Sequence, residues 1–546
     1  MSPDATQTQP GLADIVLQLS QALIDSPDDV HNNASIIKDH VEERFGAPAA
    51  GPFDPDVLDQ VAPTFMARMD LEHGGITGAP KFPNTPYFEH LWRAYLRSGK
   101  ADYAASVQLT YTHMSQGALY DHVAGGYFRY SQDGQWKQPD LEKTLYDNAL
   151  ILKGLCHLHG NIPQALYATR IRDTAAFICS ELLGEDGALI SGHAAPEDAT
   201  LYAWSQERIA SALSDPFQPS DAQRFTRIYG DGKDALPQRL SALELKDPND
   251  ELVLSAIASQ LAAASAQDRQ ALKNPLVITS AAMLAVISLV HAGKLLQHPP
   301  FVETAKTCFD RLFAHLEHTG QLPHCTIDGE TGPDGLLDDY AASGLAAIAL
   351  ACAFDEPAYL QKAERLATAI AEHFTHASGA FMASVEETPF GAVIPVMDQP
   401  VPSGNAMAIR LLWSLSRLRD APHFAEAASQ AAIAVGGEIH NNFMGLGSLF
   451  AAMEDIDDPI DIAWTPGDYD SETIAWALAP PGALIVPPAL QAQHSAAPIQ
   501  AAHETAGVVL CRKDSQSIDL PERAGAIDAL RSARRLAPEM AGGMIL

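Results

Sequence analysis

The densest collection of chemically capable side chains lies between Gly117 and Asn148. This stretch is rich in aromatic residues, charged residues and glycines, and apolar segments flank it on both sides. Surface linkers are usually poor in Trp and Tyr, whereas buried helix interiors are poor in Asp, Arg and Lys. A stretch that is rich in both kinds of residue predicts the lining of a cleft.

The second half of this stretch predicts a helix that begins at Pro139 and Asp140, because proline ends the preceding loop and aspartate caps free backbone N–H groups. In such a helix Asp140, Lys143 and Asp147 would share one stripe. One interpretation is an N-cap followed by a surface ion pair between Lys143 and Asp147, and exposed pairs of that kind contribute little stability. The other interpretation, favoured by the aromatic residues before the helix, is a pocket.

In its order of residues the stretch resembles the signature of the YyaL-like proteins, a family related to the spermatogenesis-associated thioredoxin-domain proteins. The family pattern has a glycine-rich segment that ends in Arg-Tyr-Ser, then a tryptophan, then a segment that ends in Leu-Tyr-Asp-Asn. The matching positions are Tyr120, Asp121, Gly125, Gly126, Arg129, Tyr130, Ser131, Asp133, Trp136, Pro139, Glu142, Lys143, Leu145, Tyr146, Asp147 and Asn148. One position departs, because the family's histidine before Phe-Glu-Lys is Asp140 here.

Further segments resemble the same family. Residues 74–84 match its Ala-Pro-Lys-Phe-Pro loop, which makes Lys81 a candidate for the rim of a cleft, with a rigid structural loop as the alternative. Trp204 matches the end of a Tyr-x-Trp segment. Residues 337–341 and 402–405 match Leu-Asp-Asp-Tyr-Ala and Pro-Ser-Gly-Asn segments, each at the start of an inner helix. Helix capping is the alternative role for the polar residues there.

Two family features are missing. The family carries Asp-Asp-Lys and Trp-Asn-Gly groups before a helix that corresponds to residues 271–289, and neither group is present. A thioredoxin-like domain with a cysteine motif usually precedes the loop at residues 74–84, but the first cysteine of this chain is Cys156. We therefore expect the thioredoxin module to be absent, and with it any thiol–disulfide function.

Composition bounds the class of protein. The chain has 546 residues, of which 47% are hydrophobic, so it can bury a large core. Its 35 basic and 68 acidic residues give a formal charge of −33, which argues against a nucleic-acid binder and a polybasic membrane-surface protein. The six cysteines are too scattered for a disulfide framework. No secretory signal or long apolar run is evident, so we expect a cytoplasmic protein.

The fold expectation is a mainly α-helical (α/α)6 toroid of the six-hairpin glycosidase kind. It rests on helical hairpins that recur roughly every 50 to 60 residues, together with the family resemblance. The toroid is expected over residues 13–455, after a disordered N-terminus at residues 1–12. From Ile460 onward short β-like runs alternate with helices, which predicts a small α/β region over residues 456–546.

Such a toroid has one central cleft, which we expect to be lined by the motif residues. The expected ligand-binding residues are Lys81, Arg129, Tyr130, Trp136, Tyr146, Asn148, Trp204, Tyr340 and Asn405. The expected catalytic carboxyl groups are Asp140, Glu142, Asp147 and Asp339. Aromatic platforms beside carboxylate, amide and guanidinium groups suit a sugar-like ligand. We expect no cofactor and no metal, because His157 and His159 lack a second ligand cluster nearby in the sequence and packing explains them better.

Three functions remain open. Epimerisation or isomerisation of a carbohydrate needs an acid and a base with pKa values near neutral, and the resemblance implies a histidine where this chain has Asp140. Glycoside cleavage needs two carboxyl groups across the scissile bond. A catalytically degenerate relative that binds a ligand or partner is favoured by the missing family groups. The leading hypothesis is a carbohydrate-active protein of the epimerase and isomerase class that binds a sugar-like ligand in the central cleft.

Overall fold

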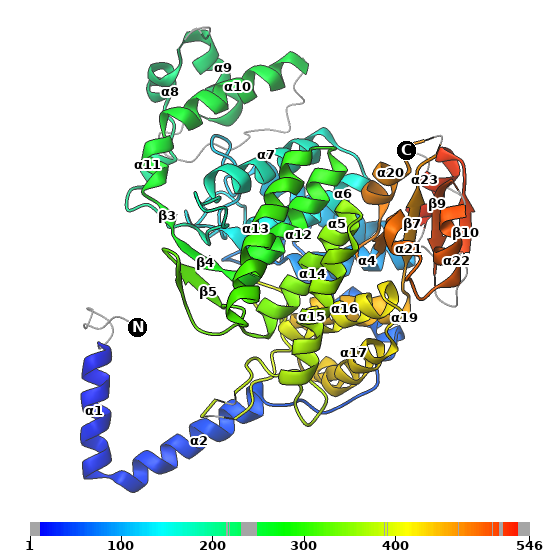
Figure 1. Cartoon of the computed structure of the whole chain (residues 1–546). Helices are drawn as coiled ribbons and strands as arrows, with labels where there is room; N and C mark the ends of the chain where they lie inside the picture. The colour runs from blue at the N-terminus through cyan, green and yellow to red at the C-terminus, as the bar shows by residue number, and fades with distance from the viewer. Residues whose placement is uncertain are drawn as a thin grey trace.

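Figure 1 shows the computed structural model of the chain, which describes residues 11–214, 217, 219–230, 248–386, 388–389, 391–467, 469–504, 506–512 and 517–532. Most of the helices gather into one central body, with a small sheet at one side (Figure 1). Two groups of helices project away from this body, one at the N-terminus and one formed by residues 206–270 (Figure 1).

An inner ring of helices forms the core of the body. In the described part of the chain its members are α4 (Thr85–Ser98), α6 (Leu145–Asn161), α12 (Thr279–Leu295), α14 (Leu337–Phe354), α16 (Gly404–Leu418) and α19 (Gly447–Asp457). Each helix packs on the next in this order, and α19 packs on α4, so the ring closes. Close packing depends on small residues: a Cβ on Gly344 of α14 would lie 2.3 Å from the side chain of Leu411 on α16.

An outer ring surrounds the inner one. Its helices are α3 (Asp56–Met66), α5 (Ala101–Gln116), α7 (Ala165–Glu181), α13 (Pro299–Thr319), α15 (Pro357–His373) and α17 (Pro422–Val435). The helices α3 and α5 pack on α4, and the other four pack on α6, α12, α14 and α16 in turn. Proline occupies the first turn of α13, α15 and α17, where its missing N–H group leaves no helical bond unmade. This double ring confirms the expected (α/α)6 toroid.

The most apolar inner helix is α14. Its length and hydropathy would suit a membrane span, yet 72% of that window is buried inside the protein. A helix that is apolar on all sides is expected wherever helices surround it on all sides. Here α12, α13, α15 and α16 all contact α14, so the ring itself explains its composition.

The start of α6 differs from the sequence-based expectation. The helix begins at Leu145, and the Thr144 side chain caps it by accepting the backbone N–H of Asp147. Residues 139–142 are not helical, and β1 (Lys143–Thr144) pairs with β2 (Gly192–His193). The predicted helix start at Pro139 is therefore wrong. Asp140, Lys143 and Asp147 do not share a helix stripe, because a strand pairing distant in sequence holds Lys143 extended.

Short strands connect the helices before residue 440. In the described residues, β2 also pairs with β3 (Lys273–Asn274), and β4 (Leu276–Ile278), β5 (Cys325–Ile327) and β6 (Glu330–Thr331) form a second small sheet. The larger sheet of the structure has the order β10-β9-β7-β8, built from β7 (Asp461–Thr465), β8 (Leu484–Val486), β9 (Gly507–Cys511) and β10 (Ser517–Leu520).

The C-terminal region packs against the ring. Its helices are α20 (Ser471–Leu478), α21 (Pro488–Gln491), α22 (Ala497–Gln500) and α23 (Arg523–Ser532), with the 3-10 helix η4 (Ala501–Glu504). Helix α20 contacts both α6 and α12. At the end of α6 a Cβ on Gly160 would lie 1.7 Å from the carbonyl oxygen of Ala477, so glycine allows this close approach. The expected α/β appendage is thus present.

Two segments within the predicted toroid range lie outside the rings. Helices α1 (Leu12–Asp25) and α2 (Pro27–Phe45) have no buried residue and extend away from the body (Figure 1). Helices α8 (Gln206–Ala212), α9 (Pro219–Tyr229), α10 (Pro248–Ala264) and α11 (Ala266–Gln270) follow η1 (Ala199–Leu201). The sequence between residues 214 and 250 is rich in proline and aspartate, yet its described part is helical at 219–229 and from 248. Residues 231–247 lie outside the described residues, as do residues 1–10 of the N-terminus predicted to be disordered over 1–12, and Leu12 already belongs to α1.

Between α17 and α19 the chain turns through three short helices. These are η2 (Gly436–Glu438), α18 (Ile439–Asn442) and η3 (Phe443–Gly445). The first turns of α16 and α19 then meet, because the backbone N–H of Ser403 donates to the Ser448 hydroxyl at 3.2 Å. The first turns of α12 and α14 also meet, through the Ser280 N–H and the Asp339 carboxylate at 2.9 Å. Within each of these two pairs of inner helices, the helix starts therefore lie side by side.

Candidate functional site

The polar residues at the start of α6 form a cluster that is open to solvent. We call it the rim cluster, and its members are Arg129, Tyr130, Asp140, Glu142, Tyr146 and Asp147. Arg129 Nη1 lies 2.7 Å from Glu142 Oε2, and the two side chains remain 39% and 37% exposed. Against the effect of burial, the Glu142 carboxylate and the nearby Tyr146 side chain raise the pKa of Arg129. Because the ion pair is half exposed, both partners can exchange this contact for a ligand.

An aromatic platform adjoins this ion pair. The rings of Tyr130 and Phe82 are stacked with centroids 4.7 Å apart. Asp140 accepts the backbone N–H of Glu142 at 3.1 Å. Its negative charge raises the pKa of the Tyr130 hydroxyl. The loop before α6 thus presents ring faces and a carboxylate side by side.

Asp147 is the buried acid of the rim cluster. Its side chain accepts the Thr144 hydroxyl at 2.6 Å. Burial raises the pKa of Asp147 to about 7, although the Thr144 hydrogen bond and the Arg129 charge favour the ionised form. A carboxyl group that titrates near neutral pH is suited to donate or accept a proton.

Two predicted site residues are structural instead. Lys81 is 2% exposed, and its Nζ lies 2.6 Å from the Asp70 carboxylate and 2.7 Å from the Gly74 carbonyl. Trp136 is fully buried, and its indole N–H donates to the His73 carbonyl at 2.9 Å. The polar atoms of both side chains are hydrogen-bonded within the protein. The structure therefore buries these two residues, which the sequence predicted to line the cleft surface.

Two predicted asparagines have the same structural task. Asn148 on α6 bonds both the N–H and the C=O of Tyr127, at 2.6 and 2.9 Å. Asn405 on α16 bonds both the N–H and the C=O of Phe381, at 2.9 and 2.8 Å. Both asparagines are fully buried. Each fastens the loop before its inner helix, which leaves neither amide available to a ligand.

Asp339 connects two inner helices and a histidine. Its buried carboxylate accepts the N–H groups of Ser280 and Leu336, each at 2.9 Å. It also lies 2.8 Å from Nδ1 of His324, and this bond raises the pKa of His324. The His324 side chain remains 31% exposed. The sequence analysis missed this imidazole, because no motif marks it, yet it is a candidate for proton transfer.

The remaining predicted residues lie apart from the rim cluster. The Tyr340 ring packs beside Phe374, with centroids 5.2 Å apart. Trp204 is 3% exposed and belongs to the separate core under α8, α9 and α10. The Arg208 guanidinium lies 4.1 Å from its ring centroid. The structure therefore brings together six of the predicted residues at α6 and distributes the others among structural contacts.

A repeated Asp-x-x-x-Gly-Gly turn supports this end of the toroid. In the first copy Asp70 bonds Lys81, and in the second Asp121 lies 2.7 Å from Nζ of the fully buried Lys143. Each lysine also donates to the carbonyl of the first glycine, which is Gly125 in the second copy, at 2.8 Å. Both copies are visible in the sequence, so this pairing could have been recognised there.

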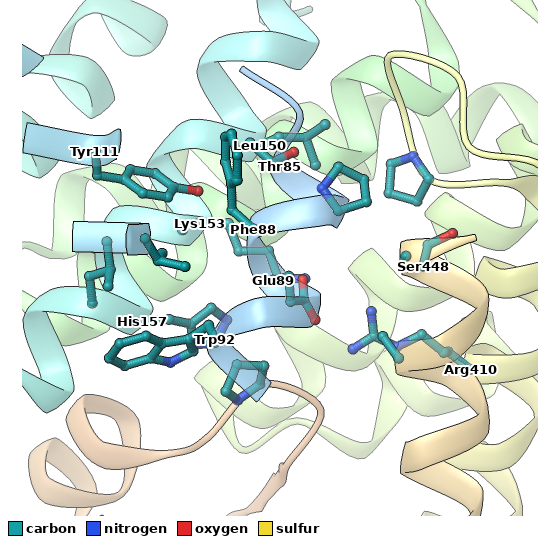
Figure 2. Close-up of a pocket in the computed structure, with 18 residues that line it drawn as sticks. Thr85, Phe88, Glu89, Trp92, Tyr111, Leu150, Lys153, His157, Arg410 and Ser448 are labelled. Carbon is teal, nitrogen blue, oxygen red and sulfur yellow. The ribbon is translucent and has the colours of Figure 1, made fainter. Parts of the chain in front are cut away.

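A second polar region, missed by the sequence analysis, lies inside the inner ring. Glu89 of α4 interacts electrostatically with Lys153 of α6 and Arg410 of α16. Because α4 and α16 are not neighbours, this interaction crosses the interior of the ring. Arg93, which is fully buried, joins Glu89 at 3.0 Å to Asp455 at 2.8 Å. Figure 2 shows Glu89, Lys153 and Arg410 around a gap between these helices.

Most of the cysteines are poorly suited to redox chemistry. All six are unpaired. Burial raises the pKa of Cys179, Cys308 and Cys511 to about 11 each. A thiol must ionise to attack a disulfide, so these groups are weak nucleophiles near neutral pH. Among the described residues, no group of three or more His, Cys, Asp and Glu side chains could hold a metal ion.

The closed double ring defines this chain as an (α/α)6 toroid. Solved structures with similar architecture include a D-mannose isomerase, with 14% identity and a TM-score of 0.46, covering 70% of this chain and 86% of that chain. Another is the cellobiose 2-epimerase of Bacillus thermoamylovorans, with 11% identity and a TM-score of 0.46, covering 69% and 85%. A third is an α-mannanase of Bacteroides thetaiotaomicron, with 12% identity and a TM-score of 0.43, covering 71% and 87%.

Sequence relatives confirm the family resemblance. The chain is similar to spermatogenesis-associated protein 20 of Rattus norvegicus, with 27% identity over 160 residues that cover 27% of this chain and 20% of the rat protein. An uncharacterized protein of Caenorhabditis elegans is 22% identical over 426 residues, which cover 67% of this chain and 57% of the worm protein. The aligned regions are thus a minor part of the rat protein and little more than half of the worm protein. No protein-family model matches the chain.

Proposed function

We propose that this chain is a carbohydrate-binding protein of the sugar epimerase and isomerase-like toroid class, and that the rim cluster holds a sugar-like ligand. The observation that carries the proposal is the half-exposed ion pair of Arg129 and Glu142 beside the stacked rings of Tyr130 and Phe82. Ring faces pack on the apolar face of a sugar, and charged groups bond its hydroxyl groups. The predicted site residues that are buried already use their polar atoms in bonds within the protein, so they cannot contact a ligand in the same way.

The evidence from geometry is stronger for binding than for catalysis. Asp147 and His324 are candidates for proton transfer, because Asp147 has a pKa of about 7 and His324 is half exposed. The residue at the position of the family histidine is Asp140, which is committed to the turn through the Glu142 N–H. A catalytically degenerate relative that still binds its ligand is therefore the second candidate function.

A panel of aldoses, ketoses and amino sugars tests the binding proposal. We expect at least one sugar to raise the melting temperature of the wild type, because a ligand that binds only the folded state stabilises it. Arg129→Met should abolish the shift. Arg311→Met is the matched control, since Arg311 pairs with Asp186 on the outer ring and is 33% exposed. Absence of a shift with every sugar in the wild type contradicts the proposal.

The Asp147→Asn variant tests whether the raised pKa of Asp147 makes stability depend on pH. The folded state holds the Asp147 proton up to a pKa of about 7, against 3.8 for an ordinary aspartate. Between these values the folded state binds more protons than the unfolded state, so ionisation of Asp147 lowers stability as pH rises. We expect Asp147→Asn to gain roughly 2.5 kcal/mol relative to the wild type between pH 5 and pH 8, measured by urea unfolding. Loss of stability at both pH values would assign Asp147 a structural role only.

A further inference from the structure

A separate cavity lies inside the ring, and its lining is mostly apolar with three charged side chains. It occupies about 50 Å³ between α4, α5, α6, α16 and α19. The charged side chains that line it are Glu89, Lys153 and Arg410, and the apolar wall includes Phe88 and Leu150 (Figure 2). None of the rim-cluster residues lines it. The proposal below therefore does not rest on the proposed sugar site.

The two cations of this cavity are incompletely paired. Lys153 Nζ lies 3.5 Å from Glu89 Oε2, a long contact for an ammonium group with three N–H donors. Glu89 Oε1 is already bonded to Arg93 at 3.0 Å. Arg410 donates its Nε–H to Asp455 Oδ2 at 3.1 Å. Among the described residues, this is the hydrogen bond that the Arg410 guanidinium makes. Donor groups of Lys153 and Arg410 thus remain available to a ligand.

Solvent reaches these groups even though they lie within the ring. The side chains of Lys153, Glu89 and Arg410 are 24%, 21% and 20% exposed. Burial together with the charges of Arg410 and Arg93 lowers the pKa of Lys153, whereas Glu89 raises it. An added negative charge would relieve the repulsion between the cations. The observed arrangement is consequently that of an anion site that Glu89 satisfies only in part.

We propose that this cavity binds a short monocarboxylate, from acetate to butyrate in size, with its carboxylate between Lys153 and Arg410. The cavity volume of about 50 Å³ is several times the roughly 10–15 Å³ that one water molecule needs on the same measure, so it suits a small organic ion. The alkyl end would contact Phe88, Leu150 and the neighbouring apolar wall. Glu89 disfavours phosphate and sulfate, because a dianion would meet stronger repulsion from the same carboxylate.

Titration with carboxyl-labelled acetate, propionate and butyrate tests the proposal, with sodium chloride at matched ionic strength as the blank. Binding is followed by carbon NMR of the labelled carboxyl group. We expect saturable binding in the wild type and at least about tenfold weaker binding in Lys153→Met and Arg410→Met, since charge-assisted hydrogen bonds are lost. Arg419→Met is the matched control, because Arg419 is 21% exposed and pairs with Glu364 outside the cavity.

Glu89→Gln supplies the complementary variant. It keeps both cations and removes the competing carboxylate, so we expect tighter binding of the same acids. If either methionine variant fails to fold, this variant decides: unchanged or weaker binding overturns the proposal. Absence of saturable binding in the wild type, or wild-type affinity in both methionine variants, also overturns it. Retention of acetate binding in Arg129→Met would separate this cavity from the sugar site.

Discussion

Replacement of Arg93 by methionine is expected to lower the free energy of unfolding by about 3–5 kcal/mol. Arg93 is fully buried and lies 3.0 Å from Glu89, 2.8 Å from Asp455 and 3.6 Å from Glu454. These carboxylates raise the pKa of Arg93 above its usual range against the effect of burial. Removal of the guanidinium leaves the three carboxylates inside the ring without their positive partner. Removing one partner of a buried ion pair is strongly destabilising, because the other charge stays buried and uncompensated.

The position of Arg93 makes the effect global. It joins α4, the first inner helix, to α19, the last one, so it closes the ring between segments 362 positions apart. Urea unfolding followed by tryptophan fluorescence measures the loss. Arg512→Met is the control, because Arg512 lies 2.6 Å from Asp458 and the two side chains are 38% and 26% exposed, so we expect it to lose only about 1 kcal/mol. Equal losses in the two variants would contradict the central role of Arg93.

The same residues show why the sequence predicted the fold better than the site. Helix α4 has polar residues such as Glu89 and Arg93 among apolar ones, a pattern that normally marks a solvated helix face. In a closed ring one polar face points at the axis instead. Periodicity along one helix cannot tell whether its polar face points to solvent or to the ring axis, because the answer depends on whether α19 packs against α4 and closes the ring. The hairpin repeat was therefore predictable, whereas the interior charge network was not.

The structure brings several of the predicted motif residues together near α6 but gives them different contacts. Asn148 and Asn405 were expected to line a cleft, and the structure uses both amides to bind loop backbone. An asparagine at a helix start has the same appearance in either role. Lys143 was placed on a helix with Asp147, because a Pro-Asp pair is a common helix start. In the structure Lys143 is extended instead, because it pairs with His193 in a neighbouring strand.

Replacement of Lys143 by methionine is the other change for which we expect a loss of about 3–5 kcal/mol. Its Nζ is fully buried, 2.7 Å from Asp121 Oδ2 and 4.9 Å from the ring centroids of Phe128 and Phe177. Burial alone would raise the pKa of Asp121, but Lys143 and two backbone N–H donors hold it below its usual value. Without Lys143 the Asp121 carboxylate remains buried but has no cation to compensate its charge.

The loss should depend on pH in a direction that identifies its cause. In Lys143→Met the folded-state pKa of Asp121 rises above the unfolded value, so the folded state takes up a proton as pH falls and the deficit shrinks. We expect a smaller deficit at pH 4.5 than at pH 7.5 in urea unfolding. The double variant Asp121→Asn with Lys143→Met should lose less at pH 7.5 than Lys143→Met alone, because no unpaired charge remains. A deficit independent of pH and unchanged in the double variant would attribute the effect to packing around the lysine stem instead of to the ion pair.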